Sequence, residues 1–440
     1  MDCAAQGTDH TLAEVNNMLD LAYIREHKDE VREAIKTRAP KLDFEGLLKV
    51  DSSRRELLKE LEALRGEKNK ANDKITALLK EKKDPKPTIS SMKVISQKID
   101  NLESKVGDLD KKLTDLMLIF PNIPHKTVKK GVDSTQNTQI LTWGTPKKPD
   151  FRPKEHIEIG QELGILDLPR AAKITGSGFA VYTGAGARLQ RALINFMLDE
   201  HTKEGYTEYW PPSLVNRLSM TGTGQLPKFE EDMYRLKDDD LFLIPTAEVP
   251  ITNLHRDEVL KEDELPLKYT AYTPCFRREA GSYGKDTKGL VRVHQFDKVE
   301  LVKFSKPENS YDEHEKLLKD AERILQKLGL PYRVMQLCSG DMGFAAAKCY
   351  DIEAWAPGLG RWLEVSSVSN FEAFQARRAN IRYKRKETGK TEFVHTLNGS
   401  GLALPRTMIA ILENFQNADG SVLIPEVLRP YMNGQTVLKK

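Results

Sequence analysis

The segment 273–300, TPCFRREAGSYGKDTKGLVRVHQFDKVE, holds the densest set of side chains that could carry chemistry. It reads as a strand, a glycine-containing polar loop and a returning strand. Arg277 and Glu279 are two residues apart, so on a strand they face the same side, and Arg292 and Phe296 do the same on the return. Arginine grips phosphate or carboxylate through paired hydrogen bonds, and an aromatic ring can stack on a base. These residues suit a bound nucleotide, although a salt-bridged surface hairpin explains them equally well.

Two further segments decide between these interpretations. GYTEYWPP at 205–212 follows an amphipathic helix, and SGLALPRTMIAILEN at 400–414 reads as a strand that leads into a helix. With 273–300 between them, they resemble, in order, the three motifs of class II aminoacyl-tRNA synthetases. HQFDKVE at 294–300 and TGTGQLPKFEEDMY at 221–234 resemble the bacterial-type seryl-tRNA synthetases in particular, and the resemblance runs from Met18 to about Tyr431.

The resemblance implies an ATP-dependent ligase that forms seryl-adenylate and passes the seryl group to tRNA(Ser), with tRNA(Sec) as a further family expectation. In the family pattern Arg277 bridges the serine carboxylate and the α-phosphate, Glu279 faces the adenine amine, and Arg406 binds the far phosphates; these three are the expected catalytic residues. The implied ATP-binding residues are Arg277, Arg278, Glu279, Arg292, Val293, Phe296, Glu364, Val365, Ser366, Ser367 and Arg406. Pro405 departs from many bacterial relatives, but proline is tolerated in a first helical turn, so we expect Arg406 to keep its place.

The implied cofactor is Mg²⁺, held by Glu364 and Ser367 of the sequence EVSS. Mg²⁺ prefers a few oxygen ligands beside substrate phosphates, although EVSS alone reads as an ordinary edge strand. An archaeal form of the enzyme binds zinc, and the scattered cysteines Cys3, Cys275, Cys338 and Cys349 argue against that form. We therefore expect Mg²⁺ and no zinc, and we expect Cys275 to be packed rather than nucleophilic.

The serine pocket implied by the family is Thr246, Ala247, Glu248, Arg277, Glu300 and Ser400, with Asn398 as a neighbour. Carboxylates can hold the substrate ammonium and hydroxyl, and a site that hydrogen-bonds a hydroxyl rejects analogues without it by large factors. By the plainer interpretation Thr246 is only a helix N-cap, and both can hold at once.

Residues 52–118 predict an antiparallel helical hairpin. Residues that are apolar except for Lys68 follow steps of three and four in two runs: Leu57, Leu61, Leu64, Lys68, Ala71, Ile75 and Leu78, then Met92, Ile95, Ile99, Leu102, Val106, Leu109, Leu113 and Leu116. Pro85 and Pro87 interrupt them, since proline cannot continue a helix. Each arm of about 30 residues spans roughly 45 Å. The pattern allows a dimerisation rod; the family resemblance makes it a tRNA-binding arm.

These elements predict an α+β fold: a class II synthetase mixed or antiparallel sheet flanked by helices, preceded by the coiled-coil hairpin. The expected divisions are an extension or tag-like segment at 1–17, an N-terminal tRNA-binding domain at 18–125, a linker at 126–155 and a catalytic domain at 156–440. Motif 1 implies a homodimer. Two alternatives remain, a paralogue that activates an amino acid without charging tRNA, and a non-catalytic tRNA-binding or coiled-coil protein.

The bulk composition agrees with this class. The 440 residues carry a formal net charge of +3, which excludes a polycation but not a local basic face. No apolar run reaches the roughly 20 residues that span a bilayer, and no signal peptide is recognisable. Four cysteines without a Cys-x-x-Cys pair fit a reducing compartment, so we expect a cytoplasmic enzyme.

Overall fold

The computed structural model describes residues 19–146, 148–280 and 288–440, so the segment predicted as an extension, 1–17, lies outside the described residues. The chain divides into two compact units, the first ending at Phe120 and the second beginning at Pro121. Within the stretch predicted as a linker, Thr138–Trp143 forms strand β1. Among the described residues, no helix has both the length and the apolar character needed to cross a bilayer.

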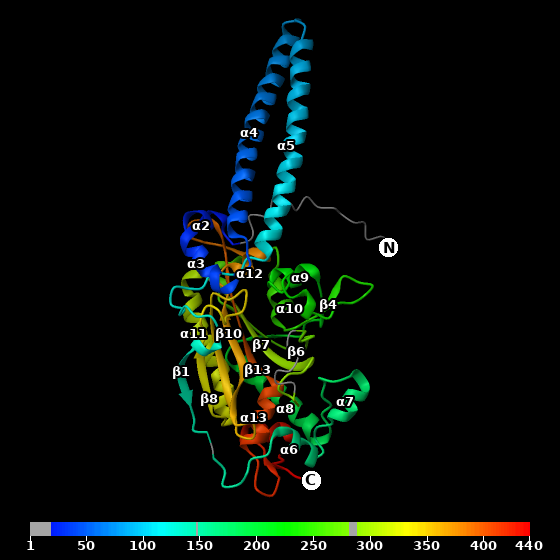
Figure 1. The fold of residues 1–440 in the computed structure, drawn as a ribbon, viewed down its shortest axis with the longest axis vertical. Coiled ribbons are helices and arrows are strands. Elements are labelled where there is room, and N and C mark those ends of the chain that lie inside the picture. Colours follow the sequence, from blue (N-terminus) through cyan, green and yellow to red (C-terminus); the bar gives the residue numbers. More distant parts are fainter. Residues whose placement is uncertain (1–18, 147, 281–287) are drawn as a thin grey trace. The chain divides into compact units, whose positions relative to one another are not determined.

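The predicted helical hairpin is confirmed in the N-terminal unit (Figure 1). The unit consists of α2 (Leu21–Glu26), α3 (Lys28–Arg38), α4 (Phe44–Lys80) and α5 (Lys86–Leu118). Helix α4 begins earlier than predicted, because the Asp43 carboxylate accepts a hydrogen bond from the Gly46 amide at 2.8 Å and caps the first turn. Pro85 and Pro87 stand at the start of α5, where a missing amide proton costs no helical hydrogen bond.

The packing of the hairpin changes along its length. Leu61, Ile99 and Leu102 form a buried cluster in its middle. Towards Phe120 the α5 seam continues through Val106, Asp110, Leu113 and Met117. The predicted seam positions Leu109 and Leu116 are therefore wrong by one residue, because the Asp110 carboxylate turns inward to bond Arg54 of α4. Towards the turn the seam residues Ala71, Ile75 and Leu78 of α4 are only partly buried.

The second unit is built on an eight-stranded sheet in the order β1-β8-β9-β10-β13-β7-β6-β2. The strands are β1 (Thr138–Trp143), β8 (Tyr332–Gln336), β9 (Lys348–Ala356), β10 (Arg361–Asn370), β13 (His395–Ala403), β7 (Gln295–Ser305), β6 (Leu267–Phe276) and β2 (Thr207–Tyr209). All neighbouring pairs are antiparallel except β2 and β6. The predicted α+β fold with a mixed, mainly antiparallel sheet is confirmed.

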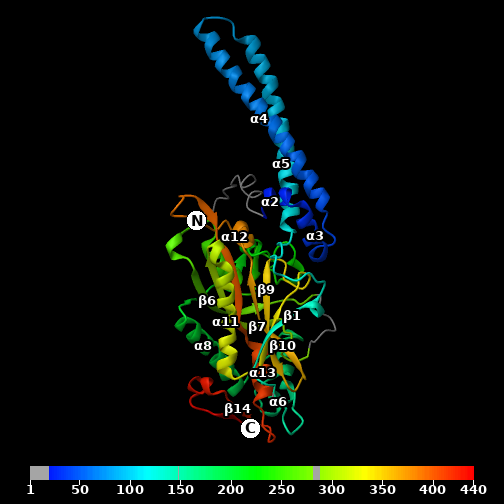
Figure 2. The same ribbon diagram turned by 90° about the vertical axis from the view of Figure 1, so that its left-hand side faces the viewer.

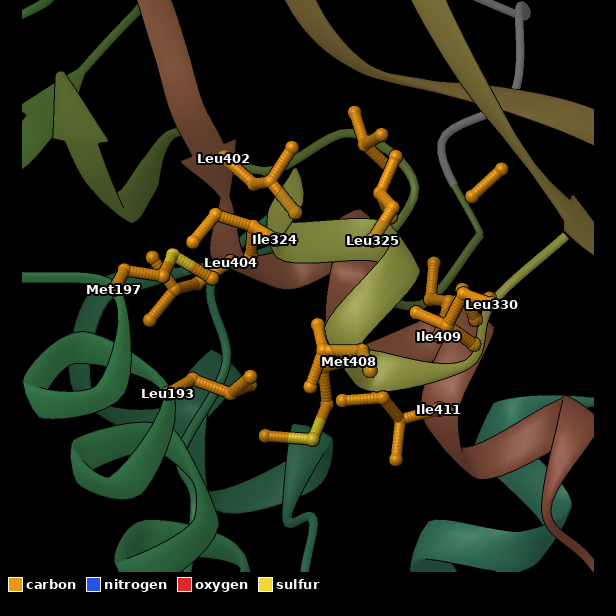
Figure 3. Packing of buried hydrophobic residues seen from close by; sticks show 14 of the residues in the cluster. Leu193, Met197, Ile324, Leu325, Leu330, Leu402, Leu404, Met408, Ile409 and Ile411 are labelled. Atoms are coloured by element: carbon orange, nitrogen blue, oxygen red, sulfur yellow. The ribbon is translucent and has the colours of Figure 1, made fainter. Parts of the chain in front are cut away.

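Three helices bury one face of this sheet. They are α8 (Gly184–Lys203), α11 (Ser310–Leu328) and α13 (Leu404–Asn414), close to the predicted helical ranges. Figure 2 shows α11 alongside the strands. Figure 3 shows Leu193 and Met197 of α8, Ile324 and Leu325 of α11 and Met408 of α13 meeting in one apolar cluster. The cluster also includes Val299 and Leu301 of β7, so Glu300 between them belongs to the other face.

Shorter elements complete the second unit. They are α6 (His156–Glu162), α7 (Leu168–Thr175), β3 (Leu214–Asn216), α9 (Arg217–Gly222), β4 (Leu241–Leu243), α10 (Glu248–Thr252), β5 (Val259–Lys261), α12 (Phe374–Arg378), β11 (Arg382–Lys384), β12 (Thr391–Phe393), β14 (Val422–Leu423) and β15 (Val437–Leu438). Among them α10 and α12 carry side chains that matter for the site.

The Arg54–Asp110 pair provides a test of what stabilises the hairpin. The two side chains are only 12% and 4% exposed, so Asp110→Ala leaves a buried guanidinium without its carboxylate and should lower the free energy of unfolding by about 3 kcal/mol. The matched control is Glu103→Ala, since Glu103 also bonds an α4 arginine, Arg65, but the two side chains are 44% and 57% exposed. That change should cost less than about 1 kcal/mol. Denaturant unfolding followed by circular dichroism measures both, and equal losses would contradict the assignment.

Candidate active site

The predicted site residues gather on the sheet face that the three helices leave open. A cavity of about 770 Å³ lies there. Of the predicted residues it is lined by Thr246, Glu248, Arg277, Glu279, Arg292, Val293, Phe296, Glu300, Glu364, Val365, Ser366, Ser367, Ser400 and Arg406. Ala247 is instead fully buried beside the cavity wall, and Arg278 is exposed and donates to the Glu231 carbonyl oxygen at 3.1 Å. The structure therefore brings together all of the predicted site residues except these two.

Two β-bulges aim polar side chains into this cavity. The register of β10 against β9 shifts between Glu364 and Ser366, so Glu364 and Ser367, three residues apart, both line the cavity. The register of β13 against β7 shifts in the same way between Ser400 and Leu402, which leaves Ser400 at the cavity and Leu402 in the apolar core. A bulge adds one residue to a strand and re-aims the side chains beside it.

The corner between β6 and β7 differs from the predicted pair of strands. Strand β6 ends at Phe276 and β7 begins at Gln295, so the expectation that Arg277, Glu279 and Arg292 lie on strands is wrong. Glu279 instead has a left-handed backbone, φ 51°, which turns its carboxylate into an ion pair with Arg292. The corner is tied by the Arg277 amide, which donates to the His294 carbonyl oxygen at 2.8 Å. Gly281 and Gly284 of the intervening loop lie outside the described residues.

Arg277 lies between two parts of the cavity. Its Nε donates to the Pro245 carbonyl oxygen at 3.4 Å, immediately before Thr246, and its guanidinium carbon is 5.2 Å from the centre of the Phe296 ring. That separation permits a cation–π contact. The guanidinium thus reaches both the Thr246 side of the cavity and the Phe296 side.

Arg406 and Glu364 meet at another wall of the cavity. Pro405 lies in the first turn of α13, as expected, and Arg406 follows it. The Arg406 Nε donates to the Val291 carbonyl oxygen at 3.1 Å, and one terminal nitrogen donates to the Glu364 carbonyl oxygen at 2.8 Å. The same terminal nitrogen is 3.4 Å from a Glu364 carboxylate oxygen, so this arginine already faces an anionic group.

Asp351 is an acidic group of the site that our sequence analysis missed. It is paired across the strands with Ser367, and burial and the Glu364 carboxylate raise the pKa of Asp351 well above its usual value. A carboxylate whose charge is disfavoured in this way gains from a nearby cation. No sequence pattern singled out Asp351, because it faces Ser367 only through the pairing of β9 with β10. Two residues earlier on β9, the thiol sulfur of the buried Cys349 is 3.1 Å from the Ser367 hydroxyl.

A compact ionic cluster forms the part of the cavity around Thr246. The Lys298 ammonium is 2.8 Å from the Thr246 hydroxyl and 2.5 Å from a Glu300 carboxylate oxygen. The Thr246 hydroxyl donates to Glu300 at 3.1 Å. Thr246, Lys298 and Glu300 are all buried. Lys298 was not predicted, although its place two residues from both Phe296 and Glu300 on one strand would have put it on the same face.

Glu248 lies beside this cluster at the start of α10. The Thr246 hydroxyl accepts from the Glu248 amide at 3.2 Å, but the N-cap residue of α10 is Ala247, so the prediction that Thr246 is the N-cap is wrong by one position. Burial, with Glu300 nearby, raises the pKa of Glu248 from 4.5 to about 7. Cys275, buried under the corner, has a thiol pKa raised by burial, which fits packing rather than nucleophilic chemistry.

Two family models match this chain. The sequence profile of the class II tRNA synthetase core domain (G, H, P, S and T) matches residues 228–415, and that of the seryl-tRNA synthetase N-terminal domain matches residues 18–124. Fold, cavity and profile together define a class II aminoacyl-tRNA synthetase.

Comparison with individual relatives shows to which family of class II aminoacyl-tRNA synthetases the chain belongs. Serine–tRNA ligase from Thermodesulfovibrio yellowstonii is 56% identical over 418 residues, covering 94% of this chain and 99% of the relative. The structure of seryl-tRNA synthetase from Pyrococcus horikoshii complexed with ATP is 40% identical, with a TM-score of 0.91 over 96% of this chain and 99% of that one. The chain therefore belongs to the seryl-tRNA synthetase family and is an ATP-dependent ligase that forms aminoacyl-tRNA.

A more distant structure has the same fold. It is that of M. kandleri SerRS with A. aeolicus tRNASec, which is 19% identical with a TM-score of 0.57, covering 79% of this chain and 71% of that chain. At this identity the likeness concerns the fold alone.

The raised pKa of Glu248 gives a stability test. The unfolded carboxyl titrates near 4.5 and the folded one near 7, so the folded state binds more protons and loses stability as pH rises between these values. Glu248→Gln removes this loss. It should leave stability unchanged near pH 4.5 and raise the free energy of unfolding by up to about 3 kcal/mol above pH 7. Denaturant titrations of the catalytic unit at the two pH values measure it, and a variant less stable than the parent at high pH would contradict the assignment.

Proposed function

We propose that the chain activates L-serine with ATP to seryl-adenylate and then transfers the seryl group to tRNA(Ser). The observation that carries this proposal is the position of Arg277. Its guanidinium contacts both the Pro245 carbonyl oxygen and the Phe296 ring, so it reaches the Thr246 side of the cavity and, opposite it, a base-stacking surface. A residue that joins carboxylate and α-phosphate needs that reach.

The first step needs positioning and charge stabilisation rather than a protein nucleophile. A serine carboxylate oxygen attacks the α-phosphorus, and pyrophosphate leaves with the electrons of the broken phosphoanhydride bond. Arg277 neutralises charge that develops at the α-phosphate, and Arg406 binds the far phosphates. Phe296 stacks on adenine, and Glu279, oriented by Arg292, accepts from the adenine amine.

Serine is recognised in the ionic cluster. Glu300 is already paired with Lys298 and Thr246, which leaves Glu248 as the carboxylate for the substrate ammonium. Ser400, also at the cavity, and Glu300 are in reach of the substrate hydroxyl. An amino acid without that hydroxyl would leave these buried polar groups unpaired.

The residues around Glu364 fit a Mg²⁺ ion. The Glu364 carboxylate and the Ser367 hydroxyl offer the oxygen ligands that Mg²⁺ prefers beside phosphates. The neighbouring Asp351 carboxyl, whose pKa is raised by burial and by Glu364, supports a cation at this wall. When bound there with ATP, Mg²⁺ screens the negative charge of the phosphates.

The hairpin is the proposed tRNA-binding element of a domain at 18–125, and residues 156–440 form the proposed catalytic domain. Residues 69–97 around its turn hold seven lysines against three acidic residues, a net charge of +4. This local excess suits a phosphate backbone, although the whole chain is nearly neutral. We extend the proposal to tRNA(Sec), as the family resemblance of the sequence implies.

The proposal also includes a homodimer and a cytoplasmic location. In the motif 1 segment Trp210 is 77% exposed, and Leu214 and Leu218 nearby are 39% and 63% exposed. This apolar surface supports a homodimer through motif 1. The three described cysteines, Cys275, Cys338 and Cys349, are free thiols, which suits the reducing bacterial cytoplasm.

Arg277→Ala tests the activation step. Serine-dependent exchange of labelled pyrophosphate into ATP should fall by at least about 1000-fold, because charge stabilisation at the reacting phosphate is worth that much in comparable sites. Arg278→Ala is the matched comparison. The Arg278 guanidinium bonds the Glu231 carbonyl oxygen away from the cavity. The exchange activity of this variant should therefore fall by less than about tenfold. Near-normal exchange by Arg277→Ala would refute the proposed role.

Shortening the hairpin tests tRNA binding. Deleting residues 69–97 and joining Lys68 to Lys98 by a short glycine turn keeps the buried cluster of Leu61, Ile99 and Leu102. Pyrophosphate exchange should stay within about twofold of the parent, whereas tRNA(Ser) charging should lose at least about tenfold in kcat/KM, since the phosphate contacts of the tip are gone. Charging at normal tRNA affinity would make the hairpin a structural rod. Parallel assays with tRNA(Sec) test the extension.

A further inference from the structure

The serine pocket is held from behind by a buried glutamine that does not line the cavity. Gln375, on helix α12, is 1% exposed. Its side-chain amide nitrogen donates to a Glu248 carboxylate oxygen at 2.6 Å and to the Thr223 carbonyl oxygen at 3.3 Å. Its amide oxygen accepts from the Thr396 hydroxyl of β13 at 2.8 Å. One side chain therefore ties together α10, the C-cap of α9 and the sheet.

The orientation of this amide is fixed by its partners. The Thr223 carbonyl oxygen and the ionised Glu248 carboxylate only accept hydrogen bonds, so the NH2 group faces both of them. The opposite orientation would point the amide oxygen at a carboxylate and a carbonyl oxygen. Thr396, itself fully buried, then supplies the donor for the amide oxygen.

The charged surroundings of Glu248 explain why such a donor matters. The facing charges are Glu300 and Lys298, both on β7, and its hydrogen-bond partners are the neutral amides of Gln375 and Asn398. Glu300 has its own cation, because Lys298 lies 2.5 Å away. Two carboxylates and one ammonium leave one negative charge, which a substrate ammonium would balance. Until serine arrives, the Glu248 carboxylate is stabilised chiefly by neutral donors.

We propose that Gln375 is a positioning residue for serine binding, which keeps the Glu248 carboxylate ionised and aimed at the place of the substrate ammonium. The inference rests on the proposed function and adds to it a residue that never touches substrate. Gln375 lies 127 positions along the chain from Glu248 and outside all three motifs.

The titration of Glu248 predicts the direction in which loss of the Gln375 hydrogen bond changes serine binding. Burial and Glu300 raise its pKa to about 7, and the Gln375 hydrogen bond opposes that rise. Removing the donor should raise the pKa further, so less of the carboxylate is ionised at a given pH. For a rise of one unit, the ionised fraction falls about ninefold at pH 6, about fivefold at pH 7 and about twofold at pH 8. Serine binding should weaken in the same proportions.

The experiment is the KM for serine in pyrophosphate exchange, measured with the full chain between about pH 6 and about pH 8, where the ammonium of free serine stays protonated. Gln375→Met keeps the side-chain length and removes the donor. We expect its KM relative to the parent to be raised most at pH 6 and to converge on the parent as pH rises. The KM for ATP should stay within about twofold at every pH, and kcat at saturating serine should change far less than the KM for serine.

Gln190→Met is the matched control. Gln190 is also a buried glutamine, 6% exposed, whose side-chain nitrogen donates to a carboxylate, that of Asp297, at 2.9 Å. Asp297 does not line the cavity. This variant should lose stability comparable to Gln375→Met without a pH-dependent change in the KM for serine.

Thr396→Val keeps the inference testable if Gln375→Met does not fold. It removes only the hydroxyl that fixes the amide oxygen, and we expect a smaller shift in the same direction. A KM ratio that is constant with pH in whichever of the two variants folds would overturn the positioning role and leave Gln375 as packing. Absence of serine-dependent exchange in the parent chain would instead overturn the proposed function, so the two failures are distinguishable.

Discussion

The site depends on one constraint, the alternation of side chains across an antiparallel sheet. On β7, Val299 and Leu301 enter the apolar core beneath α8, α11 and α13, while Phe296, Lys298 and Glu300 must face the other way. Because close-packed cores deform little, the helices fix the sheet, and the sheet fixes the spacing of the polar groups above it. A reaction driven by positioning rather than by a protein nucleophile needs that rigidity.

The positions that depart from the regular alternation of side chains along a strand could not be predicted from the sequence. Heptad spacing was sufficient to predict the hairpin. The resemblance to the family motifs was sufficient to predict the class of sheet and most of the cavity residues. They could not give the left-handed backbone of Glu279 or the bulge that puts Glu364 and Ser367 on one face. Both arise from tertiary packing, which overrides the two-residue period that a strand pattern assumes.

Residues missed from the sequence fall into two kinds. Lys298 stands two residues from both Phe296 and Glu300 on β7, so strict alternation would have found it. Asp351 faces Ser367 only through the pairing of β9 with β10, which the sequence does not give. Gln375 had no such signal, since it reaches Glu248 only because α12 and α10 come together in the fold. The same reasoning explains the one-residue error in the hairpin seam. An apolar repeat predicts leucine at the interface, whereas the Arg54–Asp110 pair turns an aspartate inward.

Each unit combines stable packing with groups whose charge is electrostatically unfavourable in the folded protein. In the catalytic unit, Glu248 and Asp351 are carboxylates whose ionised forms are disfavoured by burial and by a second carboxylate. Such groups destabilise the fold, but they bind a cation more strongly than solvated carboxylates would, because desolvation has already taken place.

In the hairpin, the buried cluster and the Arg54–Asp110 pair lie away from the turn, and the lysine-rich turn region has little apolar packing of its own. Its like charges repel one another in the free protein, and a polyanion that neutralises them relieves that repulsion. In both places the proposed ligand, a cation in the catalytic unit and a polyanion at the hairpin, would relieve an electrostatic cost already present in the unliganded fold.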